Sequence, residues 1–432
     1  MRGMLKSMFA SFRRHSGAFA LSGASQAISS LTNFGVLLYL IRALEKEQFG
    51  LYGLGFAILL ALAGLLSALY AVQLVVNLPD QPEYGRRVYA MEHAATLTAT
   101  GLWTIVLALL VGEVTPFLTE ADVPGVSLIL PVTFSATAFA TRDVLIRIAY
   151  IENRGSVVLL TNSVVMFAVS IVFTIAAIFG GGITAEHAIY VYGIGQLAGI
   201  LPLLAALQLP WRKLTASGVK SAISHSWVGG RWHVMTNLVY SARTQTHNFV
   251  IAPVIGLVAL AEVNSARVLL TPAVMLIPPI YQIMMPRLAE RRTNGVSSIS
   301  RMTSQITVAL ACAAAVYSIV LLTFLDWVGP LVLTPAYGDV REAVVAWSVV
   351  TVLMAVRNGL TMAQEAMRSF RDLFMVNLFA ALAAVGFSVI FAMKFGGVGA
   401  IWALAAAEFL LVVLLARSIY GQAPNTMKSR SV

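Results

Sequence analysis

The sequence predicts an all-α membrane protein with twelve transmembrane helices in two six-helix lobes around a central cavity. Of the 432 residues, 59% are hydrophobic and only 11% are charged, whereas soluble domains carry about 25% charged residues. The mean hydropathy is +0.83. Apolar runs that reach the length of a spanning helix, about 20 residues, recur along the whole chain. The charged residues fall mainly in the short segments between these runs.

Twelve apolar runs are separated by short connections, so we expect no extramembrane domain. The longest connection inside the cell, 209–225, is a predicted surface linker between an N-terminal lobe, 1–208, and a C-terminal lobe, 226–432. The first run is too long for a signal-peptide core of about 7–15 residues and predicts an uncleaved span. The predicted spans are 17–41, 49–77, 87–112, 124–150, 155–180, 184–208, 226–254, 258–286, 300–325, 341–367, 371–394 and 396–420.

The distribution of basic residues predicts the orientation. With the N-terminus in the cytoplasm, 22 of the 29 lysines and arginines lie in cytoplasmic segments, 4 lie outside and 3 lie near mid-membrane. Cytoplasmic connections of membrane proteins carry the excess of basic residues, so we expect both termini in the cytoplasm. Six spans per lobe would give the two lobes the same orientation, as in a parallel repeat. An arginine pair follows the second span of each lobe, Arg86–Arg87 and Arg291–Arg292.

Several function classes are not expected. The net charge is +10, but no basic stretch is interleaved with aromatic residues, so we expect no nucleic-acid site. There is no P-loop, no HExxH motif and no paired Cys/His motif, so neither a cofactor nor a metal is expected. No Ser/His/Asp set can be placed from the sequence, so the chain is not expected to be an enzyme. The single cysteine, Cys312, cannot form an internal disulfide.

Three arginines fall near the middle of predicted spans: Arg243, Arg267 and Arg357. A charge at this depth costs at least about 2.5–3.5 kcal/mol, and arginine does not lose its proton in proteins. Each guanidinium therefore needs a partner or water. Since intramembrane ionisable residues are usually functional, we predict that these arginines line a substrate cavity.

Polar residues accompany the arginines at helical spacing, which places them on one face of each helix. Thr236, Tyr240, Arg243 and His247 are predicted to share a face of the seventh helix. The alternative for the serines and threonines is simple hydrogen bonding between helices. Similar stripes occur on the first, eighth and tenth helices. We expect the cavity to be lined by Arg243, Arg267, Arg357, His247, Asn264, Tyr240, Gln26 and Asn33.

Acidic residues are rarer in the spans. Glu408, in "ALAAAEFLLVV", and Glu92 are candidates for binding a coupling proton, because burial raises the pKa of a carboxyl group. A buried pair with one of the arginines is the alternative. Asp143 and Arg147 are spaced i,i+4 and predict an ion pair on the fourth helix.

Prolines mark the seventh and eighth helices. The eighth holds three of them, Pro272, Pro278 and Pro279, and the seventh has Pro253. Proline removes a backbone donor and kinks a helix, so we expect these helices to be bent. Bent helices around a cavity suit a transporter that alternates its access.

Three stretches and the twelve-span length resemble the polysaccharide flippases of the Wzx type, in the multidrug/oligosaccharidyl-lipid/polysaccharide exporter superfamily. The sequence departs from that family at Thr246, where many relatives have an acidic residue, and at Glu262 and Asn264, where Gly and Tyr are usual. An "A-x-R"-like position is kept as Ala266–Arg267. The stretches are "LSGASQAISSLTNFGVLLYLIRALEKEQFGLYGLGFAI" at 21–58, "TQTHNFVIAPVIGLVALAEVNSARVL" at 244–269 and "MMPRLAERR" at 284–292.

The resemblance implies a two-lobed bundle in the bacterial inner membrane. Its members move an undecaprenyl-diphosphate-linked oligosaccharide from the inner to the outer leaflet, and polysaccharide polymerase or assembly proteins are expected partners. Guanidinium groups bind phosphate oxygens in a bidentate fork, so the arginines would receive the diphosphate. Alternatives are an ion-coupled drug antiporter of the same superfamily and a membrane glycan polymerase or ligase. A lipid II flippase is expected to have fourteen spans, and this chain has room for twelve.

Overall fold

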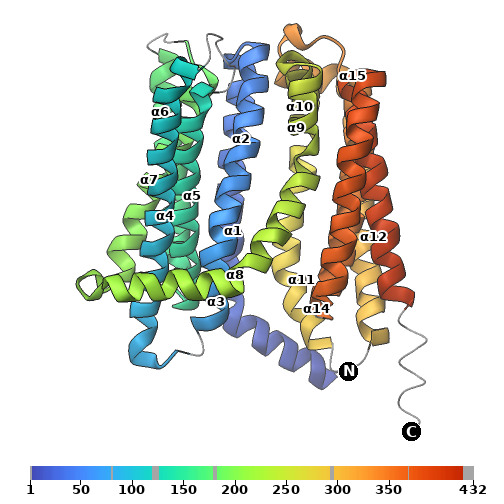
Figure 1. Ribbon diagram of the computed structural model, residues 1–432. Coiled ribbons are helices and arrows are strands. Elements are labelled where there is room, and N and C mark those ends of the chain that lie inside the picture. The colour runs from blue at the N-terminus through green and yellow to red at the C-terminus, as the bar shows by residue number, and fades with distance from the viewer. Residues whose placement is uncertain are drawn as a thin grey trace. The chain divides into compact units, whose positions relative to one another are not determined.

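The computed structural model describes residues 2–78, 81–118, 126–178, 182–291, 296–367 and 369–421, and no strand occurs in these ranges. The predicted all-α class is confirmed (Figure 1). The long helices are α1 (Arg2–Ala43), α2 (Lys46–Leu66), α4 (Glu83–Leu118), α5 (Ile129–Ile151), α6 (Gly155–Ile178), α7 (Ala185–Leu207), α8 (Ala216–Thr244), α10 (Leu257–Met275), α11 (Ile277–Arg291), α12 (Val296–Thr323), α14 (Arg341–Ala366) and α15 (Phe370–Gly421). The shorter ones are the π-helix η1 (Ser67–Ala71), α3 (Val72–Asn77), α9 (Thr246–Val254), α13 (Leu325–Val332) and the 3₁₀ turns η3 (Val126–Leu128), η4 (Trp211–Lys213) and η6 (Pro335–Tyr337).

Ten helices in the described part are long and apolar enough to cross a membrane, so the predicted number of twelve is not confirmed. One of the ten, Arg371–Ile419, contains 49 residues. At 1.5 Å per residue it is about 70 Å long, against about 30 Å of hydrocarbon, so it has the length of two spans. Gly396, with φ of 68°, interrupts it where the sequence predicts the turn between the last two spans.

The predicted seventh span, 226–254, is not a single helix. It is divided between α8 and α9 at Gln245, whose φ and ψ of −107° and 7° are not helical. Much of α8 is exposed, and from Ala216 to Tyr240 its buried residues are the small Ala222, Ser226 and Gly230. Gly230 permits a close approach there, because a β-carbon would lie 2.8 Å from the carbonyl oxygen of Leu69.

The chain packs as two compact units, residues 1–36 with 55–238 and residues 37–54 with 239–432. These units are defined by the packing of residues, whereas the predicted lobes, 1–208 and 226–432, divide the chain by its number of spans. The two lobes therefore stay a prediction. The segment 37–54 belongs to the second unit because it packs there closely. Lys46 forms an ion pair of 2.8 Å with Glu262, and a β-carbon on Gly50 would lie 2.0 Å from the carbonyl oxygen of Leu257.

Each unit is built around one largely buried helix. In the first unit, α5 packs against α4, α6 and α7, and in the second, α14 packs against α10, α12 and α15. The second helix of each unit is interrupted after a similar length, at η1 after α2 and at Leu276 between α10 and α11. The second interruption lies among the three prolines that predict a bend, Pro272, Pro278 and Pro279.

Candidate functional site

The three predicted arginines all lie in the second unit, where they make two different sets of contacts. Arg243, at the end of α8, and Arg357, on α14, both contact Glu408 on α15. Arg267, on α10, contacts His247 on α9 instead. The predicted alternative for Glu408, a buried pair with an arginine, is therefore confirmed, and it involves two arginines.

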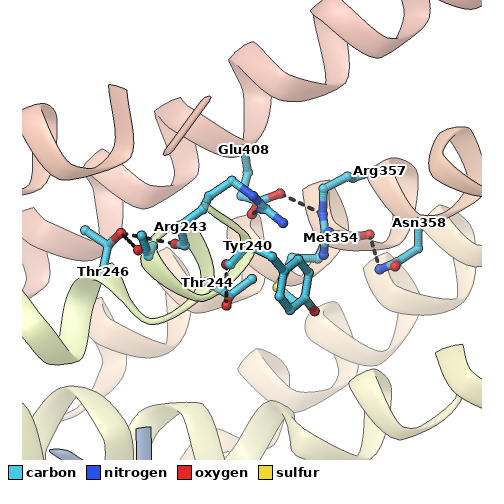
Figure 2. Close-up of polar contacts among 9 residues, drawn as sticks. Tyr240, Arg243, Thr244, Thr246, Met354, Arg357, Asn358 and Glu408 are labelled. Atoms are coloured by element: carbon cyan, nitrogen blue, oxygen red, sulfur yellow. Dashed lines mark hydrogen bonds and ion pairs between the residues drawn. The ribbon is translucent and has the colours of Figure 1, made fainter. Parts of the chain in front are cut away.

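Glu408 lies between the two guanidinium groups (Figure 2). Nη1 of Arg243 donates a hydrogen bond to Oε1 of Glu408. Nε of Arg357 lies 2.9 Å from Oε2, although its N–H is not aligned for a hydrogen bond. The side chains of Arg243, Arg357 and Glu408 are 0%, 7% and 3% exposed. The cluster thus buries two positive charges against one negative charge.

Arg243 is only partly hydrogen-bonded. Its Nε and Nη2 are buried and have no hydrogen-bond partner among the described residues. Its guanidinium lies 5.5 Å from the ring centre of Tyr240, which is 50% exposed. Because a buried charge is costly unless it is paired and hydrogen-bonded, this cluster favours a further anion.

Arg267 has a different environment. It is exposed, and its guanidinium lies over the ring of Trp347 at 5.2 Å, a cation–π contact. Nη1 lies 3.4 Å from Nε2 of the buried His247, and the indole N–H of Trp347 donates to the carbonyl oxygen of Val263 at 2.9 Å. No carboxylate of the described residues pairs with Arg267. Its guanidinium therefore lies against two aromatic rings and has no carboxylate partner in the described part of the chain.

The prediction that Thr236, Tyr240, Arg243 and His247 share one face of a single seventh helix is wrong. The helix breaks at Gln245, so Tyr240 and Arg243 lie on α8 and His247 lies on α9. Tyr240 is half-exposed, while Arg243 and His247 are fully buried. Thr246 stabilises the break, because its hydroxyl donates to the carbonyl oxygens of Ala242 and Arg243.

The remaining predicted residues are more dispersed. Asn264 lies on α10 and donates to Oδ1 of Asn248 at 3.0 Å. Gln26 and Asn33 lie on the part of α1 that belongs to the first unit, where Gln26 is half-buried and Asn33 is exposed. Their place in a substrate cavity stays a prediction.

Glu92 lies on α4 of the first unit and is half-buried. A β-carbon on Gly218 would lie 1.9 Å from its Oε1, so the carboxylate packs against the first turn of α8. The N-terminal end of a helix favours a negative charge, which explains this position without a proton-binding role. That role stays a prediction.

Sequence reasoning missed a second buried arginine cluster, in the first unit. Arg142 is buried within α5. From the sequence it lies near the cytoplasmic end of the fourth predicted span, which places it beside the cytoplasmic connection. Its Nη1 donates to Oε1 of Gln196 at 2.7 Å, and its Nη2 donates to Oδ1 of Asn162. Asn162 in turn donates to Oγ of Ser25 at 2.6 Å. The sequence did contain an indication of this cluster, because Asn162 and Gln196 are isolated amide side chains in otherwise apolar helices.

The two arginine clusters have the same construction. Arg142 and Gln196 lie on the fourth and sixth predicted spans, and Arg357 and Glu408 lie on the tenth and twelfth. In each unit an arginine of the central helix thus meets a polar side chain two spans further on, as a parallel repeat would place it. The units differ in that an amide in the first stands where a carboxylate stands in the second.

This arrangement places buried arginine clusters within a multi-pass membrane protein. Neither a protein-family model nor a curated protein matches the sequence. Solved structures do match over nearly the whole chain. A lipid II flippase, MurJ, in an inward closed conformation has a TM-score of 0.74 at 11% identity, covering 93% of this chain and 87% of its own.

Two further structures show the same likeness. An inward-facing multidrug resistance transporter of the MATE family in the MOP superfamily has a TM-score of 0.70 at 14% identity, covering 95% of this chain and 100% of its own. A MOP-superfamily transporter from Pyrococcus furiosus, described by the reverse polarity of its binding pocket, has a TM-score of 0.62 at 12% identity, covering 94% of each chain. The protein therefore has the fold of the MOP-superfamily transporters.

Proposed function

We propose that the protein is a flippase for lipid-linked oligosaccharides in surface or exopolysaccharide biosynthesis. Its substrate would be an undecaprenyl-diphosphate-linked repeat unit, moved from the cytoplasmic to the periplasmic leaflet of the bacterial inner membrane by alternating access. The observation that carries this proposal is Arg267, an exposed arginine with no carboxylate partner among the described residues. The fold shared with a lipid II flippase supports it.

The chemistry of Arg267 suits a diphosphate. A guanidinium presents a planar fork of donors that matches two phosphate oxygens, and a lysine ammonium does not. Stacking on Trp347 leaves the edge of the guanidinium, where its N–H groups lie, available. The buried Arg243–Glu408–Arg357 cluster of the same unit adds an excess positive charge. Coulomb attraction to a phosphate is strong where the dielectric constant is low.

A transport assay tests the proposal. The purified protein is reconstituted into vesicles that contain a fluorescent undecaprenyl-diphosphate sugar, and the fraction accessible from outside is followed over time. We expect Arg267→Ala to lower the rate at least about tenfold, which corresponds to one charge-assisted hydrogen bond. Arg267→Lys should keep only part of the rate. Arg341→Gln is the matched control, since Arg341 is exposed and pairs with Asp326. Full activity in both Arg267 variants would reject the headgroup role.

The second candidate is an ion-coupled drug antiporter, which the likeness to MATE transporters favours. A site for cationic drugs needs negative charge, and Arg267 provides the opposite. An efflux assay with a cationic dye distinguishes the two functions. Dye efflux by the wild-type chain, with no movement of the lipid-linked sugar, would replace the flippase proposal.

A further inference from the structure

The first unit contains an apolar groove that the transport site does not use. Its volume is about 400 Å³, within the range of about 300–1,000 Å³ that is typical of ligand pockets. The walls come from α4, α5 and α7, and Trp211 in η4 also lines the groove. The lining includes Leu102, Phe134, Thr98, Thr141, Leu197 and Trp211.

The groove has the length of one leaflet. Its lining on α4 runs from Ala94 to Ile105, a rise of about 16 Å at 1.5 Å per residue. The lining on α5 runs from Phe134 to Leu145, which is the same length. The hydrocarbon core of a bilayer is about 30 Å thick, so the groove extends through about half of it. A single acyl chain of one leaflet matches this depth.

The chemistry of the walls also suits an acyl chain. Leu102 and Leu197 are large, exposed apolar side chains on the groove wall. The polar groups there are mainly threonine hydroxyls, and these are satisfied locally. Thr98 bonds the carbonyl oxygen of Ala94 at 2.9 Å and lies 3.2 Å from the hydroxyl of Thr141. The groove therefore offers methyl and methylene contacts and few free hydrogen-bonding groups.

Two basic residues directly follow Trp211, which lines the groove. Trp211 is 45% exposed and is followed directly by Arg212 and Lys213, which are also exposed. The stretch 209–244 contains no aspartate and no glutamate. Tryptophan and basic side chains at the end of a span are typical of the membrane–water interface. The acids nearest to the lining in sequence are Glu92, which packs against Gly218, and Asp143, which pairs with Arg147.

We propose that this groove binds one anionic phospholipid of the surrounding bilayer. One acyl chain lies between α4, α5 and α7, and the headgroup phosphate contacts Arg212 and Lys213. The orientation agrees with the helix directions, since the start of α4 and the ends of α5 and α7 meet at the Trp211 end. The polyprenyl tail of a transported substrate is much longer than this groove and must move during transport, whereas a bilayer lipid can stay bound.

Lipid binding to the full-length protein tests this inference. Delipidated protein in detergent is titrated with dioleoyl phosphatidylglycerol or dioleoyl phosphatidylcholine, and bound lipid is counted by native mass spectrometry. The two lipids have the same chains, so a difference in affinity reports the headgroup. We expect one site that prefers phosphatidylglycerol by about 30-fold, from two basic side chains near the surface.

Three variants separate headgroup from chain. Arg212→Gln/Lys213→Gln removes two exposed charges and should abolish the preference for phosphatidylglycerol. Thr98→Leu fills the groove and should weaken the binding of both lipids. The matched control, Arg371→Gln/Lys394→Gln, removes two exposed charges from the second unit and should leave the site unchanged.

Two outcomes would overturn the proposal. The first is equal affinity for both lipids, or an undiminished preference in Arg212→Gln/Lys213→Gln. The second is displacement of phosphatidylglycerol by equimolar undecaprenyl phosphate with the same sensitivity to Thr98→Leu, which would assign the groove to a substrate tail. The inference does not depend on the proposed function, because a chain that moves no lipid-linked sugar can still retain this lipid.

Discussion

Among the described residues, Glu408 is the only carboxylate in the ion pairs of Arg243 and Arg357, so its removal should strongly destabilise the second unit. Glu408→Gln keeps the shape of the side chain but leaves two buried guanidinium groups without a negative partner. Removing one partner of a buried ion pair costs about 3–5 kcal/mol, because the remaining charge is then uncompensated.

This loss should appear as a large shift in thermal stability. For a domain of about 150–250 residues, 1 kcal/mol corresponds to roughly 2–4 °C, so we expect the melting temperature of Glu408→Gln to fall by about 10 °C. The measurement is a thermal shift of the purified protein in detergent, followed by size-exclusion chromatography. Unfolding of membrane proteins is often irreversible, so variants are compared at one heating rate.

Charge balance provides the control. The double variant Glu408→Gln/Arg243→Gln returns the cluster to one excess positive charge, as in the wild type. It should therefore recover a substantial part of the lost stability, which a double-mutant cycle measures. If Glu408→Gln melts within about 2 °C of the wild type, the two ion pairs contribute little and the electrostatic reasoning is refuted.

Three further predictions concern packing and charge. Gln196→Glu places a carboxylate 2.7 Å from Nη1 of the buried Arg142 and should raise the melting temperature by a few degrees, because it neutralises a buried charge; a lower value would show that burying the new carboxylate costs more than its attraction to Arg142 returns. Gly50→Val directs its β-carbon to within 2.0 Å of the carbonyl oxygen of Leu257 and should lower the free energy of unfolding by about 1–3 kcal/mol. Gly35→Ala is the control, because a β-carbon there meets nothing within 4 Å. It should be neutral or slightly stabilising in the same thermal assay. Trp347→Leu removes the ring beneath Arg267 and should lower transport severalfold; because Trp347 is buried and its indole N–H donates to the carbonyl oxygen of Val263, the variant should also lose thermal stability, so transport is compared per folded protein, and an unchanged rate would exclude a positioning role for this ring.

The structure confirms several sequence predictions that depend on local order, although not the single polar stripe on the seventh helix. The helical class follows from runs of apolar residues whose length matches a bilayer. The ion pair between Asp143 and Arg147 follows from their i,i+4 spacing, and it is present at 2.9 Å. The break at Leu276 lies beside Pro272, whose missing N–H weakens the helix wherever it occurs. Each of these features involves neighbours within about one turn of a helix.

The character of the candidate site, by contrast, is decided by contacts between distant residues. Arg243 and Glu408 are 165 positions apart, and Arg142 and Gln196 are 54 apart. The sequence alone marks Arg243, Arg267 and Arg357 as equivalent, because each is a charge in an apolar run. Only the packing of α8, α14 and α15 buries two of them against one carboxylate and leaves Arg267 exposed on Trp347. Local hydrophobicity determines which segments enter a membrane, and long-range side-chain contacts determine which charges are neutralised there.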